Sequence, residues 1–164
     1  MFTTSYKSLI GAVAVTVLGT AAMADNWRGW NIHSDGYPNT VAMDAFAELL
    51  AEKTGGEITL QMFHGGTLGS QPDAVEQVRA GALDIGNFNL GPIGPIVPAA
   101  NVVSLPFIFK DVPHMFRVLE GEAGEVVATA MGDAGVLPLA WFAAGARSFY
   151  SQKPINTPED VAGL

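Results

Sequence analysis

The sequence predicts an α/β fold built around a mainly parallel sheet. Between residues 26 and 88, strand-like and helix-like segments alternate in the order strand, helix, strand, helix, strand. Apolar residues recur at helical spacing in the two helical segments, and the last strand-like segment is mostly apolar. Strands that alternate with helices favour a largely parallel sheet, and a mostly apolar strand is typical of one covered on both faces.

The first two strands flank a helix. The first strand is predicted over residues 26–32, and a polar turn follows it. The helix is predicted over residues 40–54, with Asn39 as its cap and two glycines after its last turn. Residues 58–63 alternate apolar and polar side chains with the period of a strand. One face of the helix is predicted to pack in the core: Ala42, Phe46, Leu49 and Leu50.

The stretch from residue 68 to residue 90 holds the central helix and the third strand. Ser70 is the predicted cap of the helix, and Asp73 completes an approximate capping box. Gly81 ends the helix, and residues 83–88 then form a short, buried strand. The helix has one apolar stripe, made of Ala74, Val75 and Val78.

The rest of the chain is less regular. Four prolines between residues 92 and 106 exclude a long helix, so we expect packed irregular structure with about one helical turn, leading to a buried strand near residues 102–109. Two short helices are predicted over residues 111–119 and 121–131, and an apolar strand over residues 136–142. A helix start at Thr157 lies close to the last residue, which indicates a chain that has been cut short.

Composition narrows the possible functions. The chain has 164 residues, 49% of them hydrophobic, a net charge of −8 and no cysteine. This is enough for one ordinary domain, whose stability must come from its core. The missing cysteines exclude thiol catalysis and thiolate metal sites. So acidic a chain does not suit nucleic acid or an anionic bilayer as a partner.

Residues 1–24 are predicted to be a secretory signal peptide. Lys7 supplies the positive n-region and residues 9–18 the apolar h-region. A small-residue cleavage site, Ala22-Met23-Ala24, precedes Asp25. The apolar run is shorter than the about 20 residues of a membrane-spanning helix, so export is favoured over a membrane anchor.

Polar side chains follow the predicted strands, and we expect ligand binding there. A parallel sheet binds ligands at the carboxyl ends of its strands, where the sequence puts Asn87 and Asn89. Their amides donate and accept without charge, which suits recognition better than acid chemistry. Asn31, His33 and Asp35 follow the first strand, and they either bind a polyhydroxylated ligand or cap the turn and helix that come next.

Arg147 follows the predicted strand over residues 136–142. A guanidinium offers a rigid fork of donors that matches a carboxylate, so Arg147 is a candidate anchor for an organic acid. The alternative is a surface arginine that binds nothing.

A secreted hydrolase is the competing prediction. His64-Gly65-Gly66 follows a strand, as the oxyanion loop of esterases does, so His64 and a serine could form an active site. The chain has no Gly-x-Ser-x-Gly elbow, however. Its three histidines are far apart and it has no phosphate-loop motif, so we predict neither a metal nor a cofactor. An acidic stripe is either a solvated face or a docking surface: Asp44, Glu48 and Glu52.

The order of several short motifs resembles the extracytoplasmic solute-binding proteins of TRAP (tripartite ATP-independent periplasmic) transporters. Each motif is weak alone, but in this order they are specific, and they span essentially the whole chain after residue 24. They are Phe46-Ala47-Glu48-Leu49, Lys53-Thr54-Gly55-Gly56, Leu68-Gly69-Ser70-Gln71, Val78-Arg79-Ala80-Gly81-Ala82-Leu83-Asp84, Leu105-Pro106-Phe107-Ile108-Phe109, Gly145-Ala146-Arg147-Ser148 and Pro158-Glu159-Asp160-Val161-Ala162-Gly163-Leu164.

The resemblance implies a two-lobed periplasmic binding fold and no enzyme activity. Such a protein is a monomer in the periplasm of a Gram-negative bacterium, where it closes on an organic acid and delivers it to a membrane permease driven by an ion gradient. Proteins of this kind are about twice as long, in keeping with two domains. Residues 25–143 would form most of the first lobe, and residues 144–164 a hinge strand and the start of a truncated second lobe.

The resemblance also assigns ligand residues by motif position. Arg147 matches the first ligand arginine of the family. Asn31 and His33 lie on the ligand loop after the first strand, Gln71 begins the central helix, and Asn89 takes a position where the family often has a carboxylate.

The expected ligand is a small organic acid. The arginine that normally makes the main carboxylate pair comes a few residues after the motif that ends at Leu164, where this sequence stops. Neutral amides and His33 suit hydroxyl groups, so a sugar acid such as a uronate is expected first and a C4-dicarboxylate second.

Overall fold

The computed structural model describes residues 24–146, 148 and 150–163. In this part of the chain three strands form one sheet in the order β2-β1-β3, with bounds β1 (Asp25–Asn31), β2 (Ile58–Phe63) and β3 (Ile85–Asn87). Both pairings are parallel, and Asn31 lies opposite Asn87 at the carboxyl edge. The predicted α/β fold with a mainly parallel sheet is therefore confirmed. The predicted signal peptide lies outside the described residues except for Ala24.

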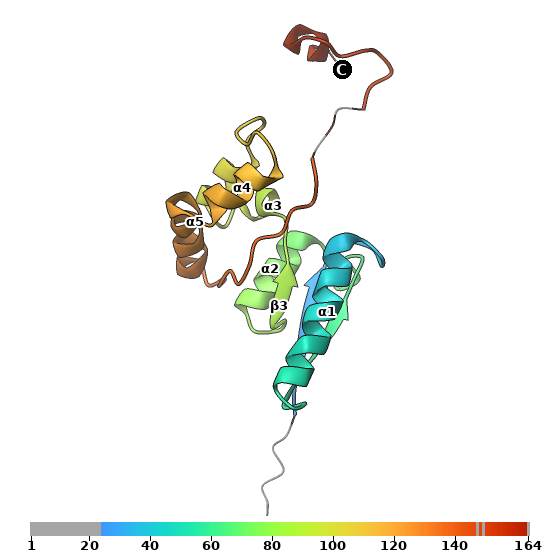
Figure 1. Cartoon of the computed structure of the whole chain (residues 1–164), viewed down its shortest axis with the longest axis vertical. Helices are drawn as coiled ribbons and strands as arrows, with labels where there is room; N and C mark the ends of the chain where they lie inside the picture. The colour runs from blue at the N-terminus through green and yellow to red at the C-terminus, as the bar shows by residue number, and fades with distance from the viewer. Residues whose placement is uncertain (1–23, 147, 149, 164) are drawn as a thin grey trace, which may run out of the picture.

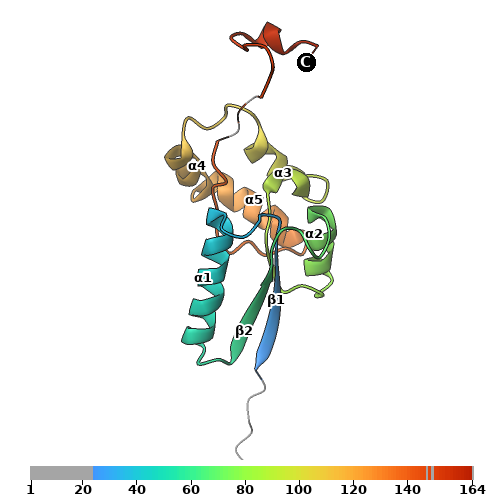
Figure 2. The ribbon, with the colours of Figure 1, turned by 90° about the vertical axis from the view of Figure 1, so that its right-hand side faces the viewer.

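Two helices cover opposite faces of the sheet, α1 (Pro38–Lys53) and α2 (Gln71–Arg79), as Figures 1 and 2 show. On the α2 face, Trp30, Ala74 and Leu83 form a buried apolar cluster. Successive residues of a strand point to opposite faces, so Asn31 points toward α1. Its side-chain amide donates a hydrogen bond to the Thr40 hydroxyl of that helix at 3.0 Å.

The two helices begin differently. α1 begins at Pro38 with Tyr37 as its N-cap, and proline fits there because its missing N–H would have no partner in the first turn. The prediction of Asn39 as the cap is wrong, since Asn39 lies buried inside the first turn. α2 has the predicted capping box: the Asp73 carboxylate accepts from the backbone N–H and from the hydroxyl of Ser70.

The predicted core face of α1 is also wrong. Met43 is buried, whereas Leu49 is 50% exposed and Phe46 is 37% exposed. The hydrogen bond between Asn31 and Thr40 requires Thr40 to face the sheet, and Met43 follows one turn later on the same side. The side of α1 that packs against the sheet is therefore the one that holds Thr40 and Met43, and part of the predicted apolar stripe is exposed.

A second layer of helices contains α3 (Leu90–Ile93), the 3₁₀-helix η1 (Pro98–Ser104), α4 (Val112–Leu119) and α5 (Glu122–Asp133). α2 joins the two layers, because Ala74 packs in the Trp30 cluster and Val75 in the core of the second layer. The predicted apolar stripe of α2 and the two predicted short helices are confirmed. The second core consists of Val75, Ile93, Val97, Ala100, Val127, Met131 and Val136.

Three strand predictions need correction. The strand predicted over residues 83–88 is shorter, because β3 covers only Ile85–Asn87. Residues 102–109 form the end of η1 and a turn, with Phe107 91% exposed. Residues 136–142 are not assigned to a strand and pair with none in the described part of the chain. An apolar run becomes a strand only beside another strand that can accept and donate its backbone hydrogen bonds.

The last described residues form a short 3₁₀-helix, η2 (Pro158–Val161), which Thr157 and Asp160 cap. The predicted helix start at Thr157 is thus found as a 3₁₀ turn. Figure 1 shows this segment apart from the sheet and its helices.

Candidate functional site

The candidate site lies at the carboxyl edge of the sheet, where three loops begin. The strands are parallel, so the loops after Asn31, Phe63 and Asn87 all leave from this edge. Arg147, the candidate carboxylate anchor, lies outside the described residues. The other five predicted ligand residues lie at the last positions of β1 and β3, in the loops that follow these strands, or at the start of α2: Asn31, Asn87, His33, Asn89 and Gln71.

Asn31 holds the first loop through two side-chain hydrogen bonds. Its side chain is fully buried, and its amide donates to the Thr40 hydroxyl at 3.0 Å. Its Oδ1 accepts from the backbone N–H of His33, also at 3.0 Å. Both polar atoms of the side chain therefore have protein partners. Asn31 holds the turn together, as in the second of the two roles that the sequence left open, and ligand binding by Asn31 stays a prediction.

His33 is half-buried and stacks on Tyr37. The two ring centroids are 4.2 Å apart and the rings are inclined by 15°. Burial lowers the pKa of the His33 imidazole below its ordinary value, because removal from water disfavours the charged form. A neutral imidazole both donates and accepts a hydrogen bond, which suits a hydroxyl group.

We expect His33 to titrate below its ordinary pKa of about 6.5. The folded state then binds this proton less readily than the unfolded state does. The contribution of His33 to stability is therefore complete above the unfolded pKa and is lost as the pH falls toward the folded pKa. A ¹H–¹⁵N NMR titration of the ring, in buffer and in urea, measures both values. A midpoint in buffer equal to or above that in urea would contradict the expectation.

Gln71 joins the start of α2 to the tip of β3. Its Oε1 accepts from the backbone N–H of Asn89 at 3.1 Å, and its Nε2 donates to the Asn89 carbonyl oxygen. Gln71 thus uses its amide within the protein, and it fixes the backbone that carries Asn89.

Asn87 and Asn89 behave differently from Asn31 and Gln71. Their side-chain amides form no hydrogen bond with another residue in the described part of the chain, although Asn87 is only 8% exposed. A buried amide normally has a partner, so these two side chains are the ones with donors and acceptors to offer a ligand.

The loop after β2 does not have the geometry of an oxyanion hole. The backbone N–H groups of Gly65 and Gly66 already donate to the carbonyl oxygens of His33 and Asn31, at 2.9 and 3.0 Å. His64 pairs through Nε2 with the Asp44 carboxylate at 2.9 Å. In the described residues no serine forms a hydrogen bond with His64, and its Nδ1 is buried without a partner. The geometry gives no support to a hydrolase, and Asp44 holds this loop on α1.

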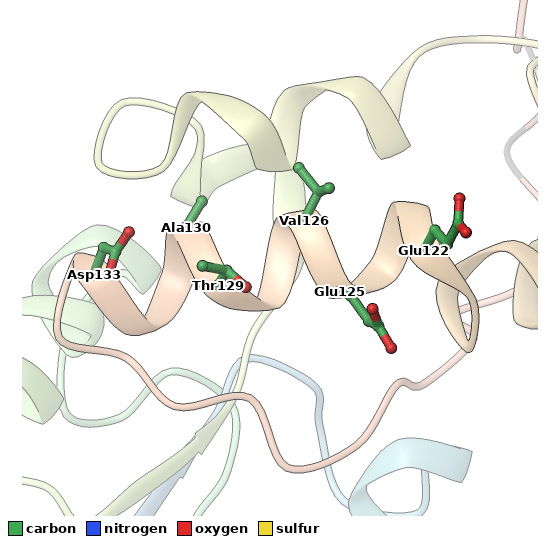
Figure 3. Close-up of a pocket in the computed structure, with 6 residues that line it drawn as sticks. All are labelled: Glu122, Glu125, Val126, Thr129, Ala130 and Asp133. Carbon is green, nitrogen blue, oxygen red and sulfur yellow. The ribbon is translucent and has the colours of Figure 1, made fainter.

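Two surface hollows lie elsewhere. One is lined only by α5 and is shown in Figure 3, where the side chains of Glu122, Glu125 and Asp133 point in different directions. These carboxylates would repel an organic anion. The other is lined by residues of one segment, Ser148 to Ile155. In the described part of the chain, no group of three or more metal-binding side chains is found, and no helix has the length and apolar composition to cross a bilayer.

Comparison with known proteins identifies the family. The family model described as bacterial extracellular solute-binding protein, family 7, matches residues 31–164. The chain belongs to this family. The resemblance to TRAP solute-binding proteins is thereby confirmed. The family model and the similar proteins are described as solute-binding proteins, which does not support the secreted hydrolase.

The relatives of this family 7 chain include a solute-binding protein from Chromohalobacter salexigens, 51% identical over 158 residues, which are 96% of this chain and 47% of that protein. A TRAP periplasmic solute binding protein from Roseobacter denitrificans was solved with bound β-D-glucuronate. It is 83% identical with a TM-score of 0.80, over 84% of this chain and 46% of that one. A Sulfitobacter protein solved with β-D-galacturonate is 57% identical, with the same TM-score and coverage. The chain spans about half the length of these relatives.

Sequence reasoning missed Tyr37 and Thr40, both of which organise the first loop. Tyr37 stacks on His33, and its hydroxyl donates to the Ala144 carbonyl oxygen at 3.1 Å. The only sequence signal for Tyr37 is its distance of four residues from His33. Thr40 gives no signal, because its role depends on a contact with β1.

Proposed function

We propose that this protein is the periplasmic solute-binding subunit of a TRAP transporter and that it captures a uronate. The main support is its 83% identity to the Roseobacter denitrificans protein that was solved with β-D-glucuronate. The side-chain amides of Asn87 and Asn89, which have no hydrogen-bond partner among the described residues, lie with the half-buried ring of His33 at one edge of the sheet. These groups provide hydrogen bonds for sugar hydroxyls.

The carboxylate of the ligand needs a positive partner. The chain carries a net charge of −8, so its overall field repels an anion and binding must depend on a local cation. Arg147 is our candidate, because a guanidinium forms two parallel hydrogen bonds with a carboxylate. In this scheme Asn31 and Gln71 act indirectly: Asn31 supports the loop that carries His33, and Gln71 supports the backbone of Asn89.

We further propose that binding occurs by closure of two lobes. Residues 25–143 would belong to the first lobe, and residues 144–164 to the hinge strand and the beginning of the second. The protein would be exported by residues 1–24, act as a monomer without enzyme activity, and pass its ligand to the membrane permease subunits. A crevice between two lobes buries most of a small ligand, and hinge closure excludes water from its hydrogen bonds.

Calorimetric titration of the protein as its gene encodes it tests this function. D-Glucuronate and D-galacturonate should bind, whereas D-glucose should not, because it has the hydroxyls without the carboxylate. Succinate, a C4-dicarboxylate, should bind more weakly than either uronate. Failure of both uronates to bind would overturn the proposal, and so would equal binding of D-glucose.

A further inference from the structure

Tyr37 connects two parts of the chain that are far apart in sequence. Its hydroxyl donates to the carbonyl oxygen of Ala144, 107 residues away, at 3.1 Å. Its ring stacks on His33, and its backbone forms the N-cap of α1. One side chain thus contacts both the loop after β1 and the segment that follows α5.

Tyr37 is held in place without help from Ala144. Its backbone N–H donates to the Ser34 carbonyl oxygen at 3.2 Å, and its own carbonyl accepts from Val41 at 3.0 Å. The stack on His33 restricts the ring further. The hydroxyl is therefore a donor in a fixed position, and Ala144 is the group that it locates.

The segment around Ala144 has no backbone pairing among the described residues to fix its path. In the described part of the chain, no backbone–backbone hydrogen bond involves residues 143–146. Gly145 has φ +81°, a left-handed conformation that glycine adopts without strain, so the backbone leaves the extended region immediately after Ala144. Figures 1 and 2 show the segment after α5 passing the carboxyl edge of the sheet, where the arrowheads lie, before it runs away from the sheet. The hydrogen bond to Ala144 therefore fixes the backbone one residue before this glycine.

We propose that Tyr37 is a positioning residue for ligand binding, which holds Ala144 and the two residues after it against the loop that carries His33. This inference rests on the proposed function. Tyr37 acts through the backbone of Ala144, because its hydroxyl hydrogen is already donated there. Losing this bond lets residues 144–146 move away from the carboxyl edge of the sheet. Uronate binding at this edge then becomes weaker.

Tyr37→Phe tests the proposal, because it removes the hydroxyl and keeps the ring that stacks on His33. The Kd for D-glucuronate should rise about threefold to tenfold, the usual effect of losing one hydrogen bond. The ¹³C signal of the Ala144 carbonyl should shift at the same time, while the signals of β1 stay in place. Tyr150→Phe is the matched control at a tyrosine that is 97% exposed, and its Kd should be unchanged.

The outcomes separate the two proposals. If the unaltered protein binds a uronate and Tyr37→Phe binds it equally well, the positioning role is wrong and the proposed function stands. A rise in Kd without a change in the Ala144 signal also contradicts the positioning role. If the unaltered protein binds no uronate, the proposed function fails, and this inference fails with it. Tyr37→Trp, which also lacks the hydroxyl and keeps an aromatic ring, provides the same comparison if the phenylalanine variant does not fold.

Discussion

Replacing Trp30 with alanine is expected to lower the free energy of unfolding by about 3–5 kcal/mol, the range for large-to-small changes in a core. Trp30 of β1 is fully buried against α2, and its ring centroid lies 5.2 Å from that of Phe88. Its indole N–H donates to the Gly69 carbonyl oxygen at 3.2 Å. The substitution leaves a cavity and removes the donor to this carbonyl. Urea denaturation followed by circular dichroism measures the loss.

Trp27→Ala provides the matched control within the same strand. Trp27 is only partly buried, and its indole N–H donates to the exposed carboxylate of Asp25. Its loss should cost at most about 1 kcal/mol, as is usual away from a core. Equal losses for the two tryptophans would mean that the Trp30 cluster is not the core of the sheet.

The parallel sheet and α2 could be predicted because their signals are local and agree with one another. Ser70 and Asp73 form a capping box within one turn, and Ala74, Val75 and Val78 follow at helical spacing. Gly81 has φ +72°, which favours glycine where the helix ends. Each of these features depends only on neighbours in sequence.

The packing of α1 could not be predicted, because it depends on a contact between elements. The buried amide of Asn31 meets Thr40, and α1 buries the side that holds Thr40 and Met43, while Phe46 and Leu49 are exposed. The strand predicted over residues 136–142 fails for a related reason. A strand requires a neighbour that supplies its hydrogen bonds, and composition does not reveal whether that neighbour is present.

The edge that carries the candidate site could be predicted, but the roles of its amides could not. A parallel sheet fixes which ends of the strands meet, so Asn31 and Asn87 were expected at one edge. Asn31 and Gln71 use their amides within the protein, whereas those of Asn87 and Asn89 have no partner in the part of the chain that the structure describes. This difference arises from tertiary neighbours, which spacing along the chain does not encode.

Arg147→Ala is expected to cause the largest loss of ligand affinity. If the guanidinium pairs with the uronate carboxylate inside a closed crevice, its removal should cost about 2–5 kcal/mol, or a rise in Kd of about 30-fold or more. Arg147→Lys keeps the charge but loses the fork of donors, so its Kd should lie between those of the unaltered protein and of Arg147→Ala.

Arg117→Ala is the control. Arg117 is exposed in the last turn of α4, and its loss should leave the Kd unchanged. Calorimetry with D-glucuronate gives the three constants, and thermal denaturation verifies that each variant is folded. A folded Arg147→Ala protein whose Kd lies within about twofold of the unaltered value would remove Arg147 from the site, because no carboxylate partner is lost at so small a cost.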